Sequence, residues 1–559
     1  MSIFDAVGAV NPGRTMFDLS HTKLCDANIG QLVPLLCEEV LPGDVFNMSV
    51  LNTIRAQPLV APIYHKLDCY FHVFFVPNRI VWDDFEEFIT GGVTGDSTIS
   101  IPTFGNEPLN VEGQFLVDRY GMWDYLGLPI HVPSTGVPSD SMEITTDSGV
   151  IDLPWRAFWA IWRDYYRDSN HMLYYPSPGS STPVEIGQGF SDQLDSLDSY
   201  MDSYSGTYVP ECDTLPYRCW TKDYFTSALP FQQRGTAPVV PIVGSGALNW
   251  DNGMPFDAVA TPLSPVNVQV SSSLAGDTGM LVPTADAATM GNHPFDGVYV
   301  DLDGIGLTTS DMRLTVQLQR YMEASARGGY RYNEFLGVHF GVKTQDFRLQ
   351  RPEYIGGSKQ PIIISEVLQT SESGTDPLGT MGGHGMGVDH NFQGKYRANE
   401  HGYIIGVMSI VPEALYQQGI DRQFTKETRF DYYSPEFAHL SEMEIKEKEL
   451  FFSDNVVTDN TRFGFQSCWD EYRTRQSKVC GKLASSLNYW HLSRIFDAPP
   501  ALNSAFLTYE ELSKNRRDAW AVPGVVDNSQ GQFLIQWRNI ITAARPLPYI
   551  SDPGLLDHV

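Results

Sequence analysis

The chain has 559 residues, with 67 Asp and Glu against 38 Lys and Arg, so its formal net charge is −29. This excess of acid excludes a protein that binds nucleic acid through bulk positive charge, because phosphate would be repelled. Hydrophobic residues make up 42% of the chain and charged residues 19%, a balance that supports a large core and excludes disorder along the whole chain.

Four segments have the pattern of β-strands. Residues 43–53 alternate apolar and polar side chains after a Pro-Gly-Asp turn, and residues 63–76 are a long aromatic and β-branched run. Near the other end, residues 403–411 and 533–542 have the same pattern. If the first and last strands share a sheet, the two ends of the chain close a β-barrel or sandwich, and the middle is inserted between strands.

The middle of the chain is acidic and contains two predicted helices. Residues 90–310 hold 26 Asp and Glu against 7 Lys and Arg. Residues 155–167 place six aromatic side chains on one stripe at helical spacing, which favours a helix packed on the core over an aromatic cofactor site. Residues 311–326 form a second helical pattern, with Ser310 as the candidate N-cap.

The cysteines are sparse for so long a chain, and no two form a CxxC pair, so free thiols in a reducing cytosol are expected. The seven are Cys25, Cys37, Cys69, Cys212, Cys219, Cys468 and Cys480. The N-terminus has no secretory-signal pattern, and no window is apolar enough to predict a membrane span. We therefore expect a product that stays where it is synthesised.

Catalytic motifs are missing from the sequence. It has no GxSxG, HExxH, Walker or dinucleotide-binding pattern. The glycine-rich run 382–387 matches none of them and is interpreted as a flexible loop. His384 and the pair Asp389-His390 could approach a metal, but no further ligand lies at a diagnostic spacing, so neither a metal site nor a cofactor is predicted. Paired carboxylates for glycoside hydrolysis stay open, because any two of the 67 acids could meet across a cleft.

Seven short phrases occur in order along the chain. They are Phe17-Asp18-Leu19-Ser20, Leu41-Pro42-Gly43-Asp44, and residues 74–88, 224–230, 326–342, 348–357 and 489–496. In this order they resemble the major capsid protein of the Microviridae, particularly its gokushovirus branch. The resemblance implies a mainly β, eight-stranded viral jelly roll with long loop insertions and a few helices, a single domain over residues 1–559, and no enzymatic activity.

The resemblance also implies partners and a location. The subunit would self-assemble through pentamers into a T=1 icosahedral shell around circular single-stranded DNA, in the host bacterial cytoplasm, and remain as the virion capsid. The implied partners are a small basic DNA-packaging protein, a DNA pilot protein and a host cell-surface receptor. Residues 245–305 take the place of a surface insertion that gathers at the three-fold axes and serves attachment. The alternative is an acidic carbohydrate-active enzyme on a jelly-roll scaffold, against which the missing secretion signal argues.

Residues 462–494 are a basic exception in this acidic chain, with 6 basic and 2 acidic residues interleaved with aromatic ones. Aromatic stacking beside a positive groove is how single strands are bound without sequence reading. The candidate contacts to DNA or to the packaging protein are Arg462, Arg473, Arg475, Lys478, Lys482 and Arg494. In the alternative interpretation these cations pair with acids of a neighbouring subunit, and the aromatic side chains are packed in a core.

Overall fold

The structure is a computed structural model, and the chain forms two compact units: Met1–Arg234 together with Ala324–Val559, and Gly235–Glu323. The described residues are 13–93, 98–102, 115–118, 121–127, 141–144, 150–172, 215–238, 247–250, 268–270, 281–283, 298–301, 309–329, 331–368, 381–526 and 530–549.

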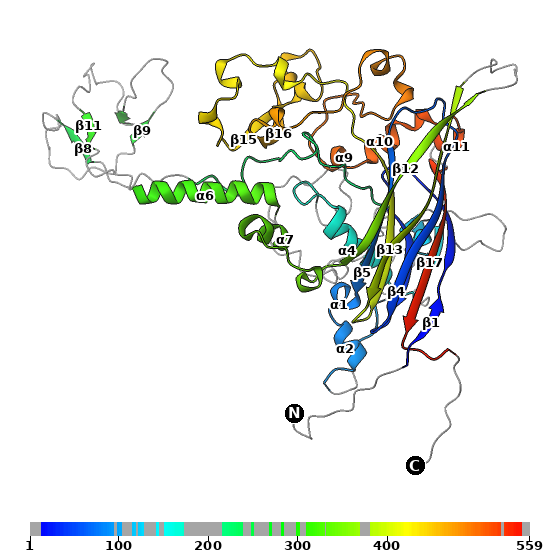
Figure 1. The fold of residues 1–559 in the computed structure, drawn as a ribbon. Helices are drawn as coiled ribbons and strands as arrows, with labels where there is room; N and C mark the ends of the chain where they lie inside the picture. The colour runs from blue at the N-terminus through cyan, green and yellow to red at the C-terminus, as the bar shows by residue number, and fades with distance from the viewer. Residues whose placement is uncertain are drawn as a thin grey trace. The chain divides into compact units, whose positions relative to one another are not determined.

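The larger unit is built on one antiparallel sheet in which the two ends of the chain meet (Figure 1). Its order is β1-β17-β4-β13-β12-β5-β14-β3, and β2 also pairs with β17. The strands are β1 (Thr15–Asp18), β2 (His21–Ala27), β3 (Val33–Val40), β4 (Val45–Ala56), β5 (Leu67–Pro77), β12 (Glu353–Leu368), β13 (Met381–Arg397), β14 (Gly402–Pro412) and β17 (Phe533–Arg545). The strands predicted at 43–53, 63–76, 403–411 and 533–542 are thus confirmed as β4, β5, β14 and β17.

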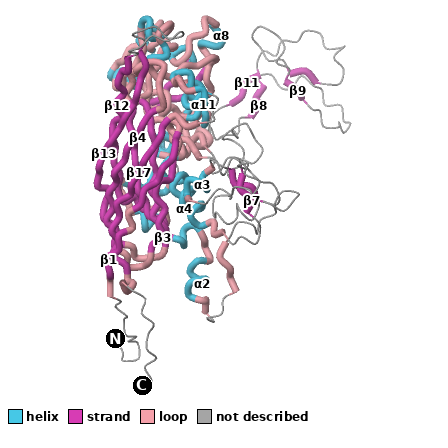
Figure 2. Tube along the Cα trace, turned by 90° about the vertical axis from the view of Figure 1, so that its right-hand side faces the viewer, coloured by secondary structure: helices cyan, strands magenta, loops and turns pink. Residues whose placement is uncertain are grey.

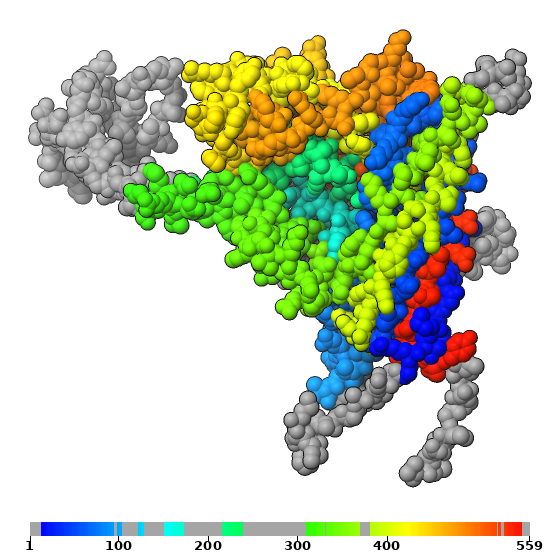
Figure 3. Space-filling model, viewed as in Figure 1, coloured from blue at the N-terminus to red at the C-terminus, as the bar shows by residue number. Residues whose placement is uncertain are grey.

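The sheet has eight strand positions, because β1 and β2 lie end to end along β17. One half holds β2, β17, β4 and β13, and the other holds β12, β5, β14 and β3. Strands that are distant in sequence alternate within each half, as in a viral jelly roll. Figure 3 shows the blue N-terminal and red C-terminal strands side by side. The first and last strands therefore share one sheet, which is the condition that the sequence analysis set for the chain ends to close the fold.

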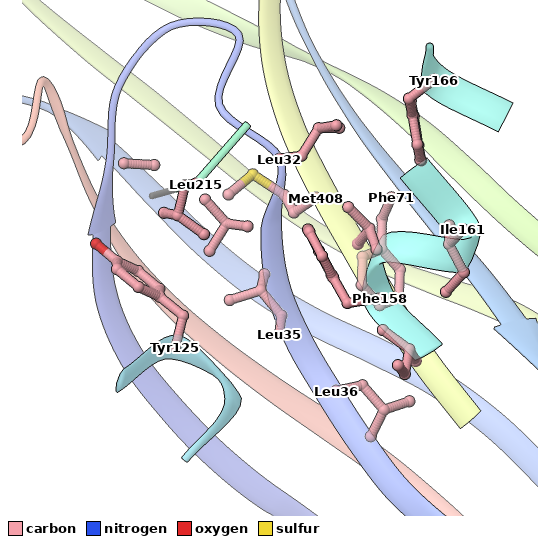
Figure 4. Close-up of a cluster of buried hydrophobic side chains, with 14 of the residues drawn as sticks. Leu32, Leu35, Leu36, Phe71, Tyr125, Phe158, Ile161, Tyr166, Leu215 and Met408 are labelled. Atoms are coloured by element: carbon pink, nitrogen blue, oxygen red, sulfur yellow. The ribbon is translucent and has the colours of Figure 1, made fainter. Parts of the chain in front are cut away.

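The core lies on the inner face of this sheet (Figure 4). Helix α4 (Leu153–Ile161) continues into a π-helical turn, η3 (Trp162–Tyr166), and α4 packs on β5 and β14. Its Phe158 is 1% exposed and lies near Phe71 and Met408 in Figure 4. Burying one such side chain stabilises the fold by about 1.5–3 kcal/mol. The predicted aromatic stripe of 155–167 is therefore core, as expected.

The glycine-rich run 382–387 was predicted to be a flexible loop, and that prediction is wrong. The run lies inside β13, paired with β12 and β4. A Cβ on Gly383 would lie 2.6 Å from the carbonyl oxygen of Ala61, and one on Gly385 would lie 2.8 Å from the Cβ of Ala56. The glycines therefore let the backbone between residues 56 and 61 approach the strand, a role that glycine often has in strand interiors.

Two long connections leave the sheet, residues 78–352 and 413–532. The first contains α1 (Asn78–Val81), α2 (Phe85–Thr90), β6 (Phe115–Asp118), α3 (Met122–Leu126), β7 (Ser141–Ile144), α4, α6 (Thr309–Gly328) and α7 (Tyr332–Phe335). The second contains β15 (Glu442–Lys446), α8 (Val456–Asp459), β16 (Arg462–Ser467), α9 (Ser504–Leu507), α10 (Glu510–Asn515) and α11 (Pro523–Val526). The helix predicted at 311–326 is confirmed as α6. Among the described residues, every helix is too short or too polar to cross a bilayer.

The insertion predicted at 245–305 lies outside the described residues except for four short strands. They are β8 (Ala247–Trp250), β9 (Val268–Val270), β10 (Leu281–Pro283) and β11 (Val298–Asp301). Strand β8 pairs with β11, and β9 pairs with β10, both antiparallel. All four belong to the smaller unit, Gly235–Glu323.

Candidate functional site

The basic segment 462–494 lies in the long connection between β14 and β17. It begins as β16, which forms an antiparallel hairpin with β15, and continues through three short 3-10 turns, η11 (Asp470–Tyr472), η12 (Gly481–Ala484) and η13 (Asn488–Trp490). A second hydrophobic cluster lies under this hairpin, formed by side chains that include Phe225, Ile445, Phe463 and Phe506. The hairpin thus has a core of its own, apart from the core of the sheet.

Five of the six candidate cations are exposed: Arg462, Arg473, Arg475, Lys478 and Lys482. Three of them face acids of the same chain, since Arg462 lies 3.6 Å from Glu444, Arg473 4.0 Å from Asp470, and Lys478 2.7 Å from Asp421. Exposed pairs of this kind contribute only about 0–1 kcal/mol. These side chains could therefore exchange an intrasubunit acid for an external anion at little cost.

Arg475 and Lys482 differ from those three. Within the described part of the chain, neither forms an ion pair, and both side chains are exposed. They are thus the two cations of the segment whose charge is least compensated inside the subunit.

Arg494, unlike the other five cations of the segment, is buried and only 4% exposed. Its Nη2 donates to the carbonyl oxygen of Phe506 at 2.6 Å, and its guanidinium carbon lies 3.9 Å from the Phe506 ring centre and 4.8 Å from that of Trp220. Cation–π contacts in such desolvated settings contribute about 2 kcal/mol. The guanidinium is thus engaged inside the subunit and supports the second cluster.

The aromatic residues of the segment divide in the same way. Phe463, Phe465 and Trp469 are buried, and the Trp469 indole donates to the carbonyl of Phe437 at 2.9 Å. For these three, the interpretation as packed side chains holds. Tyr472 is 56% exposed.

Tyr472 has a partner that the sequence did not reveal. Lys426 reaches across it, with Nζ 4.2 Å from the Tyr472 ring centre and 5.1 Å from that of Tyr432, and donates to the Tyr472 hydroxyl at 2.5 Å. The Lys426 side chain is 6% exposed and lies 3.7 Å from Glu471. No local motif joins residues 426 and 472, so only the fold shows this contact.

A cleft of about 900 Å³ in the larger unit was also missed by sequence reasoning. Aromatic side chains and cations from distant segments line it, among them His72, Tyr166, Arg218, Lys222, Arg331 and Tyr354. Burial lowers the pKa of His72 to about 4, and its Nδ1 lies 2.8 Å from the Tyr166 hydroxyl. His72 is therefore neutral at neutral pH. The cations of the cleft are partly compensated, because Asp168 and Glu334 also line it and pair with Lys222 and Arg331.

A metal-binding arrangement is not seen among the residues that the structure describes: no group of three or more His, Cys, Asp and Glu side chains could hold an ion. The six described cysteines are free thiols. The seventh, Cys212, lies outside the described residues. Burial raises the pKa of the Cys25, Cys37 and Cys219 thiols to about 12, so these three are poor nucleophiles.

Comparison with known proteins agrees with the fold. The family model described as "Capsid protein (F protein)" matches residues 6–555. The chain is 32% identical to "Capsid protein VP1" of Chlamydia phage 1, over 99% of this chain and 97% of that protein. It is 31% identical to "Capsid protein VP1" of Bdellovibrio phage phiMH2K, over 90% and 89% of the two chains. For "Capsid protein VP1" of Spiroplasma virus 4, identity is 30% over 97% and 95%.

These matches cover nearly the whole chain, and they give no support to a carbohydrate-active enzyme. A capsid protein associates with copies of itself to form a shell, so the functional surfaces of this chain are contact surfaces and not a catalytic cleft. The chain belongs to the F-type capsid protein family, in the gokushovirus-like branch of the Microviridae, and is a structural protein of a bacteriophage virion.

Proposed function

We propose that this subunit assembles through pentamers into a T=1 icosahedral shell in the cytoplasm of its bacterial host and encloses a circular single-stranded DNA genome. The observation that carries the proposal is the exposed apolar surface of the connection 413–532. Phe424 is 75% exposed, Phe430 58%, Val456 76% and Val457 81%. These large apolar side chains all belong to one connection, and contacts between copies of the chain would bury them.

A pair of double variants tests this surface. The change Phe424→Asp with Val457→Asp places charge on the apolar surface, and Phe424→Leu with Val457→Ile keeps it apolar. We expect wild type and the apolar variant to form closed particles in negative-stain electron micrographs. The aspartate variant should stay as small oligomers with an unchanged far-ultraviolet circular dichroism spectrum. Wild-type protein found only as discrete dimers or trimers would contradict the proposal.

The exposed cations of the basic segment are proposed to contact packaged DNA or a small basic packaging protein. Arg473 and Arg475 are the pair to test, because both side chains are exposed. Charge reversal of both should lower the nucleic acid content of particles while shells still form. The charge-reversed pair Lys343 and Arg348, also exposed, is the control. Undiminished DNA content in the first variant would remove these residues from the proposal.

Residues 245–305 are proposed to project near the three-fold axes and to bind a host cell-surface receptor. The assignment of this stretch to a separate compact unit, Gly235–Glu323, supports the expectation that its removal spares the sheet. Particles lacking 245–305 should assemble but fail to adsorb to host cells. Normal adsorption by such particles would contradict the proposal.

A DNA pilot protein completes the proposed partners, and its presence in purified particles is testable by mass spectrometry.

A further inference from the structure

No described helix or strand covers the outer face of the half-sheet β2-β17-β4-β13. Side chains alternate strictly along β4 and β17, with every second residue buried and the others turned outward. Helices α3 and α4 contact β3, β5 and β14, which belong to the other half. Figure 2 shows these helices on one side of the sheet and the bare strands β13, β4 and β17 on the other.

This face has an unusual charge. In a chain with 67 acidic residues, the outward positions of the three central strands carry no Asp or Glu. They carry four exposed cations: Arg55, Lys395, Arg397 and Arg538. None of the four lies within ion-pair distance of a described acid, although the charge of Arg538 is one of the causes that lower the pKa of the exposed Asp18 on β1, after the hydrogen bonds from Ser20.

The cations are spread along the strands and not clustered. Arg55 pairs with Met386 at one end of the β4–β13 register, and Arg397 pairs with Val45 at the other. These ten steps along β4 span about 33 Å. Arg538 pairs with Leu51, between the two ends. A line of positive charge therefore follows the direction of the strands, as a track for an extended polyanion would.

Only the two flanking strands add carboxylates, Asp18 on β1 and Asp26 on β2. Both are already hydrogen-bonded within the chain. Asp18 accepts from the Ser20 amide at 3.0 Å, and Asp26 accepts from the Gly531 amide and the Tyr125 hydroxyl, both at 2.9 Å. In the segment 462–494, by contrast, three of five exposed cations face acids of the same chain. The sheet face is therefore the better site for an anion.

Between the cations lie exposed apolar side chains. Phe392 is 64% exposed, Val388 58%, Met386 46% and Leu51 39%. Nucleic acid bases stack on exposed aromatic side chains beside positive charge, at about 1–3 kcal/mol per base, and they do so without sequence reading. The face thus combines cations for phosphate with apolar surface for bases.

We propose that this sheet face binds single-stranded DNA, with Arg55, Lys395, Arg397 and Arg538 on the phosphates and Phe392 against a base. The inference rests on the proposed function, because a genome must lie inside the shell. It adds a surface that the basic segment did not indicate. It also accounts for how a subunit of net charge −29 can lie beside DNA, since the outward positions of β17, β4 and β13 carry no acid.

The test measures DNA binding by the dissociated full-length subunit, so that it does not depend on shell formation. Fluorescence anisotropy of a labelled oligothymidylate is followed over a series of salt concentrations. In the face variant, Arg55, Lys395, Arg397 and Arg538 are all changed to Gln. In the matched control, four exposed cations elsewhere are changed to Gln, and these are Lys343, Arg348, Arg429 and Lys514.

The face variant should bind at least about tenfold more weakly at low salt. Its plot of log affinity against log salt should be shallower by about 3, because each lost phosphate contact removes about 0.7 from the slope. The control should keep the wild-type slope. The inference is overturned if wild type does not bind, if both variants lose affinity equally, or if the face variant keeps wild-type affinity.

Electron micrographs of the same proteins separate this inference from the shell proposal. Wild-type subunits that bind DNA through this face but form no particles would contradict the shell and leave the binding surface supported. A face variant that binds DNA normally but no longer assembles would show that the face is a contact between copies of the chain, which overturns the inference.

Discussion

Replacing Arg494 by Met tests whether this residue serves the subunit fold or the genome. The side chain is buried, donates to the Phe506 carbonyl at 2.6 Å, and lies 3.9 Å from the Phe506 ring centre. Losing a charge-assisted hydrogen bond from a buried carbonyl costs about 1.5–3 kcal/mol. Losing a desolvated cation–π contact costs about 2 kcal/mol. The methionine restores part of this by burying apolar surface, so we expect a net loss of about 3 kcal/mol.

Polar groups beside Arg494 add to the loss of stability that we expect for Arg494→Met. Burial raises the pKa of Glu511, and the positive charge of Arg494 opposes that rise. Tyr416, whose hydroxyl donates to Asp223 at 2.7 Å, also lies 3.4 Å from Arg494 Nη1. Without the guanidinium, the Glu511 carboxylate loses a neighbouring positive charge in a poorly solvated region, and the Tyr416 hydroxyl loses a hydrogen-bond donor.

The measurement is urea denaturation of the purified full-length chain, followed by tryptophan fluorescence, since Trp220 lies against Arg494. The control is Arg475→Met, at an exposed site, which should change the free energy of unfolding by less than about 0.5 kcal/mol. An Arg494→Met protein of wild-type stability that packages less DNA would refute the assignment of Arg494 to the subunit core.

Three further predictions follow from single sites. A Cβ on Gly383 would lie 2.6 Å from the Ala61 carbonyl oxygen, whereas a Cβ on Gly382 would lie 3.5 Å from its nearest atom. Gly383→Ala should therefore lower the melting temperature and reduce the free energy of unfolding by about 1–3 kcal/mol. Gly382→Ala should change both quantities little. Burial raises the pKa of Glu447 from 4.5 to about 7, so its contribution to stability is present below pH 4.5 and is lost as pH rises through 7. In urea titrations, the free energy of unfolding of Glu447→Gln should therefore exceed that of wild type by about 1–2 kcal/mol at about pH 8 and equal it at about pH 4. An equal difference at the two pH values would contradict this prediction. Native alkylation with iodoacetamide, read by peptide mass spectrometry, should modify the exposed Cys480 long before Cys37, whose thiol pKa burial raises to about 12.

Features that depend on local pattern could be predicted from the amino-acid sequence. Alternation at 43–53 and 533–542 predicted β4 and β17, because strand side chains repeat every two residues wherever one face is buried. The aromatic stripe at 155–167 predicted α4, because apolar side chains that repeat every three to four residues lie on one face of a helix. The ordered phrases predicted the family, but whether the strand patterns at the two ends of the chain share a sheet was left as a condition.

What each side chain faces could not be predicted in this way, because it depends on contacts between distant segments. Arg475 and Arg494 are the same residue type in one basic segment, yet one is exposed and the other is buried against Trp220, which lies more than 250 positions earlier in the chain. The glycine run was mistaken for a loop because the reason for its glycines is the backbone near Ala61, far away in sequence. The acid-free face appears only when β17, β4 and β13 are placed side by side. Composition sums charge along the chain, whereas the direction of a side chain is fixed by long-range pairing, and that pairing decides which charges share a surface.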